Sequence, residues 1–213
     1  MSSDVLVTTP AQRQTEPHAE AVSRNRRQQA TFRKVLAAAM ATLREKSYVD
    51  LTVRLVAARA KVAPATAYTY FSSKNHLIAE VYLDLVRQVP CVTDVNVPMP
   101  IRVTSSLRHL ALVVADEPEI GAACTAALLD GGADPAVRAV RDRIGAEIHR
   151  RITSAIGPGA DPGTVFALEM AFFGALVQAG SGTFTYHEIA DRLGYVVGLI
   201  LAGANEPSTG GSE

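Results

Sequence analysis

Residues 52–74 read TVRLVAARAKVAPATAYTYFSSK, and this segment predicts a short helix, a tight turn and a second short helix. Thr52 suits the N-cap of the first helix, because its hydroxyl can accept a hydrogen bond from a backbone N–H that has no partner in the first turn. We expect this helix to run from Val53 to about Arg59.

The second helix follows a turn at Lys61 and Val62. Pro64 can take the first helical position, where the N–H that proline lacks would have no partner anyway. We expect the helix to continue to Tyr70 or Phe71. The whole segment therefore predicts a helix-turn-helix motif.

The second helix has one inward face and a broad outward surface. Ala67 and Phe71 are four residues apart and share a face that we expect to point toward the core. The remaining positions carry mostly small or hydroxyl-bearing groups, which suit hydrogen bonds to phosphates and contacts with thymine methyl groups. These positions are Ala65, Thr66, Tyr68, Thr69 and Tyr70. Such a surface suits a DNA groove better than a pocket.

Charge is divided unevenly along the chain, although the formal net charge of the 213 residues is zero. Residues 1–75 contain 12 Lys or Arg against 5 Asp or Glu, so they carry +7. Residues 76–213 contain the other 9 against 16, so they carry −7. A basic N-terminal part beside an acidic remainder favours nucleic-acid binding through one end, with counterion release supplying affinity that does not depend on sequence.

The segment from about Phe32 to Leu77 resembles the DNA-binding domain of the TetR family of bacterial transcriptional regulators. The resemblance lies in the order of its parts: an amphipathic first helix, a Thr-Val-Arg helix start, the run Ala-Tyr-Thr-Tyr-Phe, and Ser-Ser-Lys at the start of the next helix. Two positions depart from the family pattern. Lys61 stands where the family usually has glycine, which predicts a slightly strained turn, and Ala63 stands where a capping serine is common.

The resemblance implies roles for individual residues, because the family's recognition helix matches residues 64–71. The candidates for contacts with base edges, or near them, are Ala65, Thr66, Tyr68 and Thr69. Tyr70 and Lys74 match phosphate anchors of the family. Ser72 or Ser73 can cap the next helix, so its positive dipole end beside the Lys74 charge also favours a phosphate.

Three further groups of residues are candidates for phosphate contacts. Thr52 caps a helix end, and Lys61 adds a charge in the turn. Arg26 and Arg27 close the N-terminal arm, from which they could reach a phosphate or a narrow minor groove. The alternatives are partly buried aromatic rings for the two tyrosines, and ordinary solvated charges for Lys74 and for the arginines.

The predicted fold is all-α, with an N-terminal three-helix helix-turn-helix DNA-binding domain and a larger helical ligand-binding and dimerisation domain. Residues 1–23 are polar and predict a disordered arm. The DNA-binding domain then covers residues 24–75, the helical domain residues 76–205, and a flexible tail residues 206–213. Asp134-Pro135 and Asp161-Pro162 predict two helix starts. Thr185 and Glu188 predict a capping box at the last helix.

The last two predicted helices carry more apolar surface than one packing face needs. The candidates for a dimer interface are Phe166, Phe172, Leu176, Leu193, Val197, Ile200 and Leu201. The resemblance implies a two-fold dimer through these helices. Mechanism also favours a homodimer, because two reading heads one DNA turn apart, about 34–36 Å, recognise a palindrome.

The larger domain is where the resemblance places a small molecule, and helical bundles commonly hold pockets between their helices. The candidates for lining this pocket have apolar faces or act as polar handles: Tyr82, Val86, Leu107, His109, Leu110, Val113, Cys124, Leu128, Met170 and Phe173. Core packing explains most of them equally well. The apolar character of the set favours an apolar effector.

Other classes of protein have little support in the sequence. The five histidines show no ligand spacing with Cys, Asp or Glu, so we expect no metal and no other cofactor. We find no nucleophile with its base, which argues against an enzyme. Cys91 and Cys124 have no paired spacing and fit free thiols in a reducing cytoplasm. No apolar run reaches the length of a membrane span, so we expect no membrane partner.

The sequence thus predicts a cytoplasmic transcriptional repressor that binds a palindromic operator in double-stranded DNA as a homodimer. A small apolar effector would release it. A constitutive or activating DNA-binding regulator is an alternative. A helical carrier of apolar small molecules, with a vestigial DNA-binding motif, is another.

Overall fold

The fold is taken from a computed structural model that describes residues 16–204, and within this range it is all-helical. The helices are α1 (Glu16–Leu43), α2 (Val53–Arg59), α3 (Pro64–Tyr70), α4 (Lys74–Gln88), α5 (Met99–Ala111), α6 (Pro118–Asp130), α7 (Pro135–Ile156), α8 (Pro162–Gly180) and α9 (Tyr186–Ala204). Short 3-10 turns follow α5 and α6, at Leu112–Val114 and Gly131–Ala133. The all-α prediction is confirmed.

The helix starts are formed by the caps that the sequence predicts. The Thr52 hydroxyl accepts the Leu55 N–H at 3.1 Å. Asp134 and Asp161 accept backbone N–H groups of α7 and α8 at 2.9 and 2.7 Å. Thr185 and Glu188 form the predicted reciprocal capping box before α9.

The start of α1 differs from the prediction. The helix begins at Glu16, so a disordered arm through residue 23 is wrong for residues 16–23. The segment EPHAEAVSRNRRQQ is polar but places a proline near the helix start and then contains good helix formers, and polarity alone does not prevent a helix. Residues 1–15 of that predicted arm and the predicted tail 206–213 lie outside the described residues.

The helix-turn-helix unit has a small core of its own in which α1 supports α3. Phe71 is fully buried, and its ring stacks on Phe32 of α1 with centroids 5.1 Å apart. Tyr70 meets the same Phe32 ring edge-on at 6.1 Å. Ala67 is fully buried, as the helical spacing predicts. The outward face of α3 is therefore held on a packed aromatic base.

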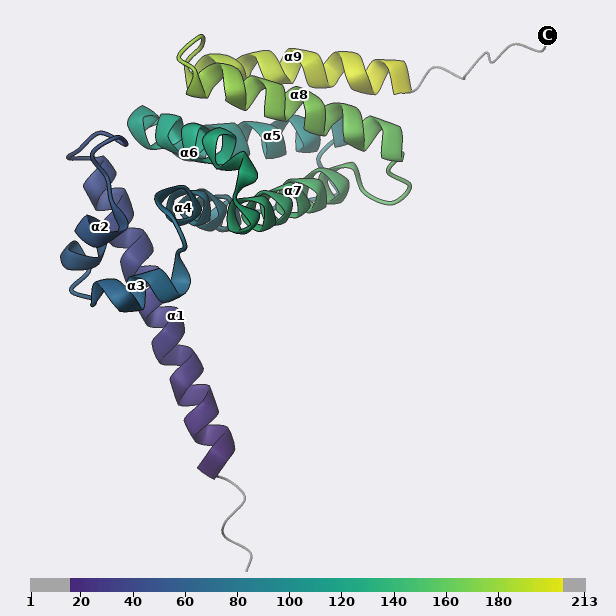
Figure 1. The fold of residues 1–213 in the computed structure, drawn as a ribbon. Helices are drawn as coiled ribbons and strands as arrows, with labels where there is room; N and C mark the ends of the chain where they lie inside the picture. Colours follow the sequence, from purple (N-terminus) through teal and green to yellow (C-terminus); the bar gives the residue numbers. More distant parts are fainter. Residues whose placement is uncertain (1–15, 205–213) are drawn as a thin grey trace, which may run out of the picture.

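The remaining helices form a bundle with α4 inside it. In Figure 1 the unit α1–α3 lies at one end, α4 to α7 form the middle, and α8 and α9 run side by side along the far face. Helix α4 packs against α6 and α7 in the bundle and against α1 of the helix-turn-helix unit. It thus joins the two parts, and α1 also packs directly against α6 of the bundle.

One buried and one partly buried arginine close two helix ends inside the bundle. Arg151 is 2% exposed, and its guanidinium donates to the carbonyl oxygens of Val86 and Val89 at 2.9 and 3.0 Å. Arg102 donates to the last carbonyl oxygens of α7, at Ala155 and Ile156. Positive charge at a helix C-terminus is favourable, so these two side chains fix the ends of α4 and α7.

Helix α8 is more apolar than expected from the sequence. By length and composition it could cross a membrane, so the expectation that no apolar run reaches that length is wrong. Only 22% of its most apolar 18-residue window is buried, yet Val165, Leu168 and Phe172 pack inside the bundle. One such helix is weak evidence of a membrane span, because core helices pass the same test.

Candidate DNA-contacting surface and effector pocket

The turn between α2 and α3 is tight and contains a residue in the left-handed region. Lys61 has a φ of 53°, the only positive φ at a non-glycine residue among the described residues. The turn is closed by hydrogen bonds from Lys61 N to Ala58 O and from Val62 N to Ala57 O. The predicted strain is confirmed, because a side chain with a β-carbon is unfavourable at this φ.

Helix α3 presents a continuous exposed surface. Ala65, Thr66, Tyr68 and Thr69 are all exposed, while Ala67 between them is buried. Tyr68 keeps 46% of its surface exposed although it is a large aromatic residue. The Thr69 hydroxyl donates a hydrogen bond to the Ala65 carbonyl oxygen at 3.1 Å. The four predicted base-contacting residues therefore share one free face.

The two predicted phosphate anchors have structural contacts as well. Tyr70 is half-buried against Phe32, as the partly buried alternative expected. The Lys74 ammonium donates to the Tyr48 carbonyl at 3.1 Å and lies 4.3 Å from the Tyr48 ring centroid. Lys74 is thus not an ordinary solvated charge, because it holds the loop between α1 and α2 against α4. Tyr48, which also bonds to Asn75, was missed by the sequence analysis.

The other predicted phosphate contacts lie at exposed positions. Thr52 and Lys61 are exposed at the start of α2 and in the turn. Arg26 and Arg27 are exposed too, but on the regular helix α1 and not in an irregular arm. A helix restricts how far these side chains can bend toward a groove, so they suit a phosphate better than the floor of a minor groove.

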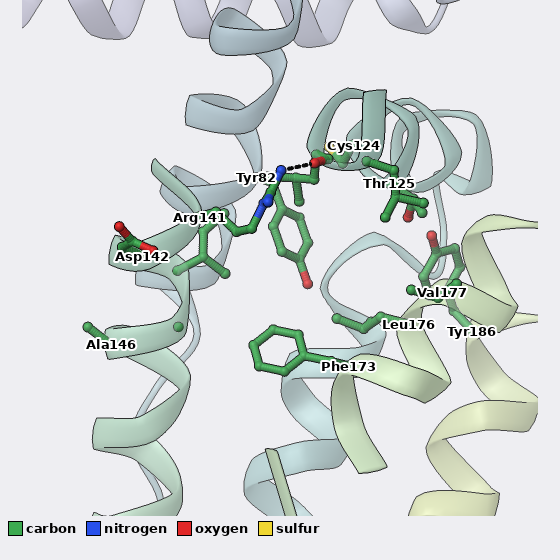
Figure 2. Close-up of a pocket in the computed structure, with 15 residues that line it drawn as sticks. Tyr82, Cys124, Thr125, Arg141, Asp142, Ala146, Phe173, Leu176, Val177 and Tyr186 are labelled. Atoms are coloured by element: carbon green, nitrogen blue, oxygen red, sulfur yellow. Dashed lines mark hydrogen bonds between the residues drawn. The ribbon is translucent and has the colours of Figure 1, made fainter. Parts of the chain in front are cut away.

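A cavity of about 630 Å³ lies between α4, α6, α7 and α8, with the first residue of α9 in its wall. Its lining comprises Tyr82, Gly121, Cys124, Thr125, Leu128, Leu129, Arg141, Asp142, Ile144, Gly145, Ala146, Phe173, Leu176, Val177 and Tyr186. Figure 2 shows the Tyr82 ring from α4 reaching into the space bounded by Phe173 and Leu176 of α8. The volume lies within the usual range for sites that hold drug-sized molecules.

Sequence reasoning located part of this lining. Tyr82, Cys124, Leu128 and Phe173 face the cavity as predicted. The others do not line it: Val86, Leu107 and Leu110 are fully buried in the core, Val113 packs against the core, His109 is exposed, and Met170 lies in a groove between α8 and α9. Helical periodicity marks apolar faces but does not distinguish a filled face from one beside a hollow.

The buried polar groups of the pocket are neutral. Burial raises the pKa of the Tyr82 phenol and raises the pKa of the Cys124 thiol to about 12. Burial also raises the pKa of Tyr186, which shares a side-chain hydrogen bond with Thr125. The buried wall therefore offers protonated hydroxyl and thiol groups and no charge. Arg141 and Asp142, which have opposite charges, are exposed members of the lining.

Polar contacts connect the pocket helices to the end of α3. The Ser73 hydroxyl, which caps α4, donates to Asp134, the N-cap of α7, at 2.9 Å. About two turns further along α4, buried Glu80 accepts a 2.6 Å hydrogen bond from Arg143 of α7. His76 lies between these contacts, 3.7 Å from the Glu80 carboxylate and edge-on to Phe71.

The predicted dimer interface is largely wrong in its residues. Phe172, Leu193, Val197 and Leu201 are buried inside the protomer, Leu176 lines the cavity, and Ile200 is partly buried. Phe166 alone of the predicted set is exposed, at 63%. The apolar residues of α8 and α9 that do face outward are Phe166, Met170, Val177, Tyr195 and Leu199. The sequence pattern thus assigned to the interface residues that lie mostly on the inner faces of α8 and α9.

Among the described residues, no group of three or more His, Cys, Asp or Glu side chains is placed to hold a metal ion. The two cysteines are free, and Cys124 is buried in the wall of the pocket.

Known proteins resemble part of the sequence and the fold of this chain. Residues 35–81 match the sequence profile of bacterial regulatory proteins of the tetR family. A TetR transcriptional regulator from Rhodococcus sp. RHA1 is 20% identical, with a TM-score of 0.70 over 84% of this chain and 98% of that one. A second transcriptional regulator from the same source is 21% identical, with a TM-score of 0.60 over 81% and 96%.

A third similar structure holds a ligand. It is the Thermus thermophilus FadR, a TetR family transcriptional repressor in complex with lauroyl-CoA, which is 18% identical with a TM-score of 0.60 over 85% of this chain and 99% of that one. At these identities the likeness shows a shared fold over nearly the full length of the other proteins. The profile match and the shared fold together identify the chain as one that carries the DNA-binding domain of the tetR family of bacterial regulatory proteins.

Proposed function

We propose that this protein is a homodimeric transcriptional repressor that binds a palindromic operator and releases it when a small, mainly apolar effector occupies the cavity beside α4. The observation that carries the proposal is the position of α4, which begins directly after the exposed helix α3 and contributes Tyr82 to the cavity wall. One rigid element thus connects a DNA-reading surface with a ligand pocket.

DNA recognition in this proposal uses the free face of α3. Thr66, Tyr68 and Thr69 present hydroxyl and methyl groups that can contact base edges, and Ala65 permits close approach of the helix backbone. Lys61, Thr52 and the surplus of positive charge in residues 1–75 supply phosphate contacts. We assign the DNA-binding domain to residues 24–75 and the effector and dimerisation domain to residues 76–205.

The homodimer is supported by the outward surface of α8 and α9, which we call the outer apolar face: Phe166, Met170, Val177, Tyr195 and Leu199. Each of these residues is at least 44% exposed, so the face is apolar and unpaired in the protomer. Added β-carbons at Gly174 and Gly198 would meet nothing within 4 Å, so these positions leave room for close helix approach. A two-fold dimer through this face would place two α3 helices on one DNA duplex.

Release of DNA requires that the effector bind one arrangement of α4 and α7 better than another. Both helices line the cavity, and Ser73–Asp134 and Glu80–Arg143 join them near the end that bears α3. An effector that separates or tilts the two helices would therefore change the spacing of the two α3 helices in a dimer. The lauroyl-CoA bound to the Thermus FadR supports an effector with an apolar body, since it shows this fold holding one.

Two alternatives use the same structure. An activator or constitutive DNA binder would keep the α3 surface and lack release by the effector. A carrier of apolar molecules would use the pocket alone. Tyr68 is a large aromatic residue that is exposed on α3, and a carrier has no use for it there. Its exposure therefore favours the DNA-binding proposals. Such a regulator would work in the cytoplasm, where bacterial DNA lies.

The test of DNA binding is selection of sequences from a random duplex pool with the full chain, followed by a salt titration on the selected site. We expect a palindrome with half-sites about one helical turn apart and affinity that falls as salt rises. Thr66→Ala should weaken binding and relax preference at one position, whereas Thr93→Ala, an exposed threonine in the loop after α4, should not. Absence of any selected sequence at low salt would contradict the proposal.

The dimer is tested separately by sedimentation of the full chain. Leu199→Glu places a charge on the outer apolar face and should shift the protein to monomers, because burial of an unpaired charge is unfavourable. Val95→Glu alters an even more exposed residue, in the loop before α5, and should leave the dimer intact. A wild-type protein that sediments as a monomer at all concentrations would overturn the homodimer.

A further inference from the structure

The pocket contains one polar group that the protein itself leaves without a partner. Tyr82 is 5% exposed, and its hydroxyl makes no hydrogen bond to any protein atom in the described part of the chain. Figure 2 shows this hydroxyl pointing into the cavity, away from the backbone of α4. A buried hydroxyl without a partner costs about 1–3 kcal/mol, so the expected partner is a molecule that occupies the cavity.

The other polar groups of the inner wall are already engaged. Tyr186 and Thr125 share a side-chain hydrogen bond, and the Cys124 thiol faces the Ile78 carbonyl oxygen at 3.9 Å. Arg141 donates to the backbone carbonyl of Leu128, which keeps its guanidinium on the wall of the cavity. Tyr82 is therefore the one inner group in the described lining that is free to orient a ligand.

The rest of the inner wall is apolar and uncharged. Leu128, Ile144, Phe173 and Leu176 provide aliphatic and aromatic surface. Burial raises the pKa of Tyr82, so its hydroxyl stays protonated and donates. Beside the Tyr82 hydroxyl a carboxylate or phosphate would lose its hydration and gain one neutral donor, which does not compensate for the loss, since the charged side chains of the described lining, Arg141 and Asp142, are exposed.

We propose that the effector is an uncharged, mainly apolar molecule with a single hydrogen-bonding oxygen, an alcohol or a ketone, that accepts a hydrogen bond from the Tyr82 hydroxyl. The inference rests on the proposed function for the location of the effector site and adds the chemical class of the effector. The apolar body lies against α6 and α8. The oxygen lies at the α4 side of the cavity.

The test is calorimetric titration of the full chain, without DNA, with 1-decanol, 2-decanone, decanoate and lauroyl-CoA. We expect the two uncharged probes to bind and decanoate, which matches them in chain length, to bind at least tenfold more weakly. Tyr82→Phe should weaken the uncharged probes about tenfold, which corresponds to about 1.4 kcal/mol.

One further measurement on Tyr82→Phe and one further variant separate a ligand-orienting role from a structural one. Tyr82→Phe without probe should unfold at the same or a higher temperature than the wild type, because it removes a buried hydroxyl that no protein group satisfies. Gly145→Leu points a side chain into open space at the cavity wall and should abolish binding of all probes while the protein stays folded.

The outcomes distinguish this inference from the function on which it rests. Tighter binding of decanoate or lauroyl-CoA, failure of both uncharged probes to bind, or equal probe affinity of wild type and Tyr82→Phe would overturn the inference. Release of selected DNA by lauroyl-CoA alone would overturn it and leave the repressor proposal standing. Tyr82-dependent binding of decanol without any effect on DNA would support the inference and contradict effector-driven release.

Discussion

The hydroxyl of Ser73 donates a 2.9 Å hydrogen bond to the carboxylate of Asp134, and each of the two residues is the N-cap of its own helix. Ser73 also accepts the His76 N–H, and Asp134 also accepts the Ala136 N–H. The hydrogen bond from Ser73 holds the pKa of Asp134 below its usual value, together with the backbone N–H. The starts of α4 and α7 are thus joined where the helix-turn-helix unit meets the bundle.

Replacing Asp134 should cost more than losing a helix cap. Asp134→Ala removes a cap, worth about 1 kcal/mol, and a charge-assisted hydrogen bond to another helix, worth about 1–2 kcal/mol. Asp161→Ala is the matched control, because Asp161 also precedes a proline and also caps its helix, but its side-chain partners are both in Thr164. We expect urea unfolding to show that Asp134→Ala lowers the free energy of unfolding by about 2–3 kcal/mol and that Asp161→Ala lowers it by less.

The same pair of variants should differ locally. Hydrogen exchange of the amides that open α4, at His76 and Leu77, should accelerate in Asp134→Ala and stay at the wild-type rate in Asp161→Ala. Equal exchange in the two variants would show that the Ser73–Asp134 contact does not hold α4.

Replacement of Lys61 by glycine should raise the stability of the protein and lower its affinity for DNA. Its φ of 53° is unfavourable for a residue with a β-carbon, so Lys61→Gly should stabilise the protein, by up to about 1 kcal/mol. The same change removes an exposed charge beside α3. It should therefore reduce the slope of log affinity against log salt concentration by about 1, the contribution of one phosphate contact. Lys61→Arg is the control that keeps both the charge and the strain, and it should change neither quantity.

The features of the fold that could be predicted from sequence are those that depend on local chemistry. Caps at Thr52, Asp134, Asp161 and Thr185 could be read from sequence because each depends on a few neighbouring residues. The start of α1 could not, since the choice between a polar helix and a polar coil depends on weak propensities. The strained turn at Lys61 was expected because the family that the segment resembles usually has glycine at this position. The structure shows the strain as a φ of 53° at Lys61.

The pocket and the outer apolar face were harder to predict, because both depend on how helices face each other. Leu193 and Leu199 lie on one apolar helix, yet the first is 3% exposed and the second 57%. Tyr82 was found as a pocket residue, but nothing in the sequence shows that its hydroxyl lacks a protein partner. Such facts appear only when residues distant in sequence are placed together, as Ser73 and Asp134 are.

The buried Arg151 should contribute far more stability than its neighbour in sequence. Both Arg150 and Arg151 bond to Glu147, but only Arg151 reaches the carbonyl oxygens at the end of α4. Arg151→Met should therefore cost about 3–5 kcal/mol, because buried acceptors lose their donor. Arg150, whose side chain is 57% exposed, should cost less than about 1 kcal/mol when changed to Met. Urea unfolding of the two variants checks the ranking, and equal losses would contradict it.

Glu80 should make the stability of the bundle depend on pH. Burial alone would raise its pKa, but the contact with His76, 3.7 Å away, and the 2.6 Å hydrogen bond and positive charge of Arg143 outweigh burial and lower the pKa. The unfolded carboxyl, with a pKa of about 4.3, therefore binds its proton before the folded one does as pH falls. The stabilisation is present above this pKa and is lost as pH falls through the lowered pKa of the folded state.

Glu80→Gln should remove that dependence. We expect the variant to be less stable than wild type near neutral pH, by about 2 kcal/mol, because Arg143 loses its ionised partner. Between pH 5 and about pH 3 its free energy of unfolding should fall less steeply, by up to about 1.4 kcal/mol per pH unit. Glu119→Gln changes an exposed carboxylate of α6 and serves as the control. Urea unfolding across this range decides the matter, since parallel curves for wild type and Glu80→Gln would show that Glu80 titrates alike in the folded and unfolded chains.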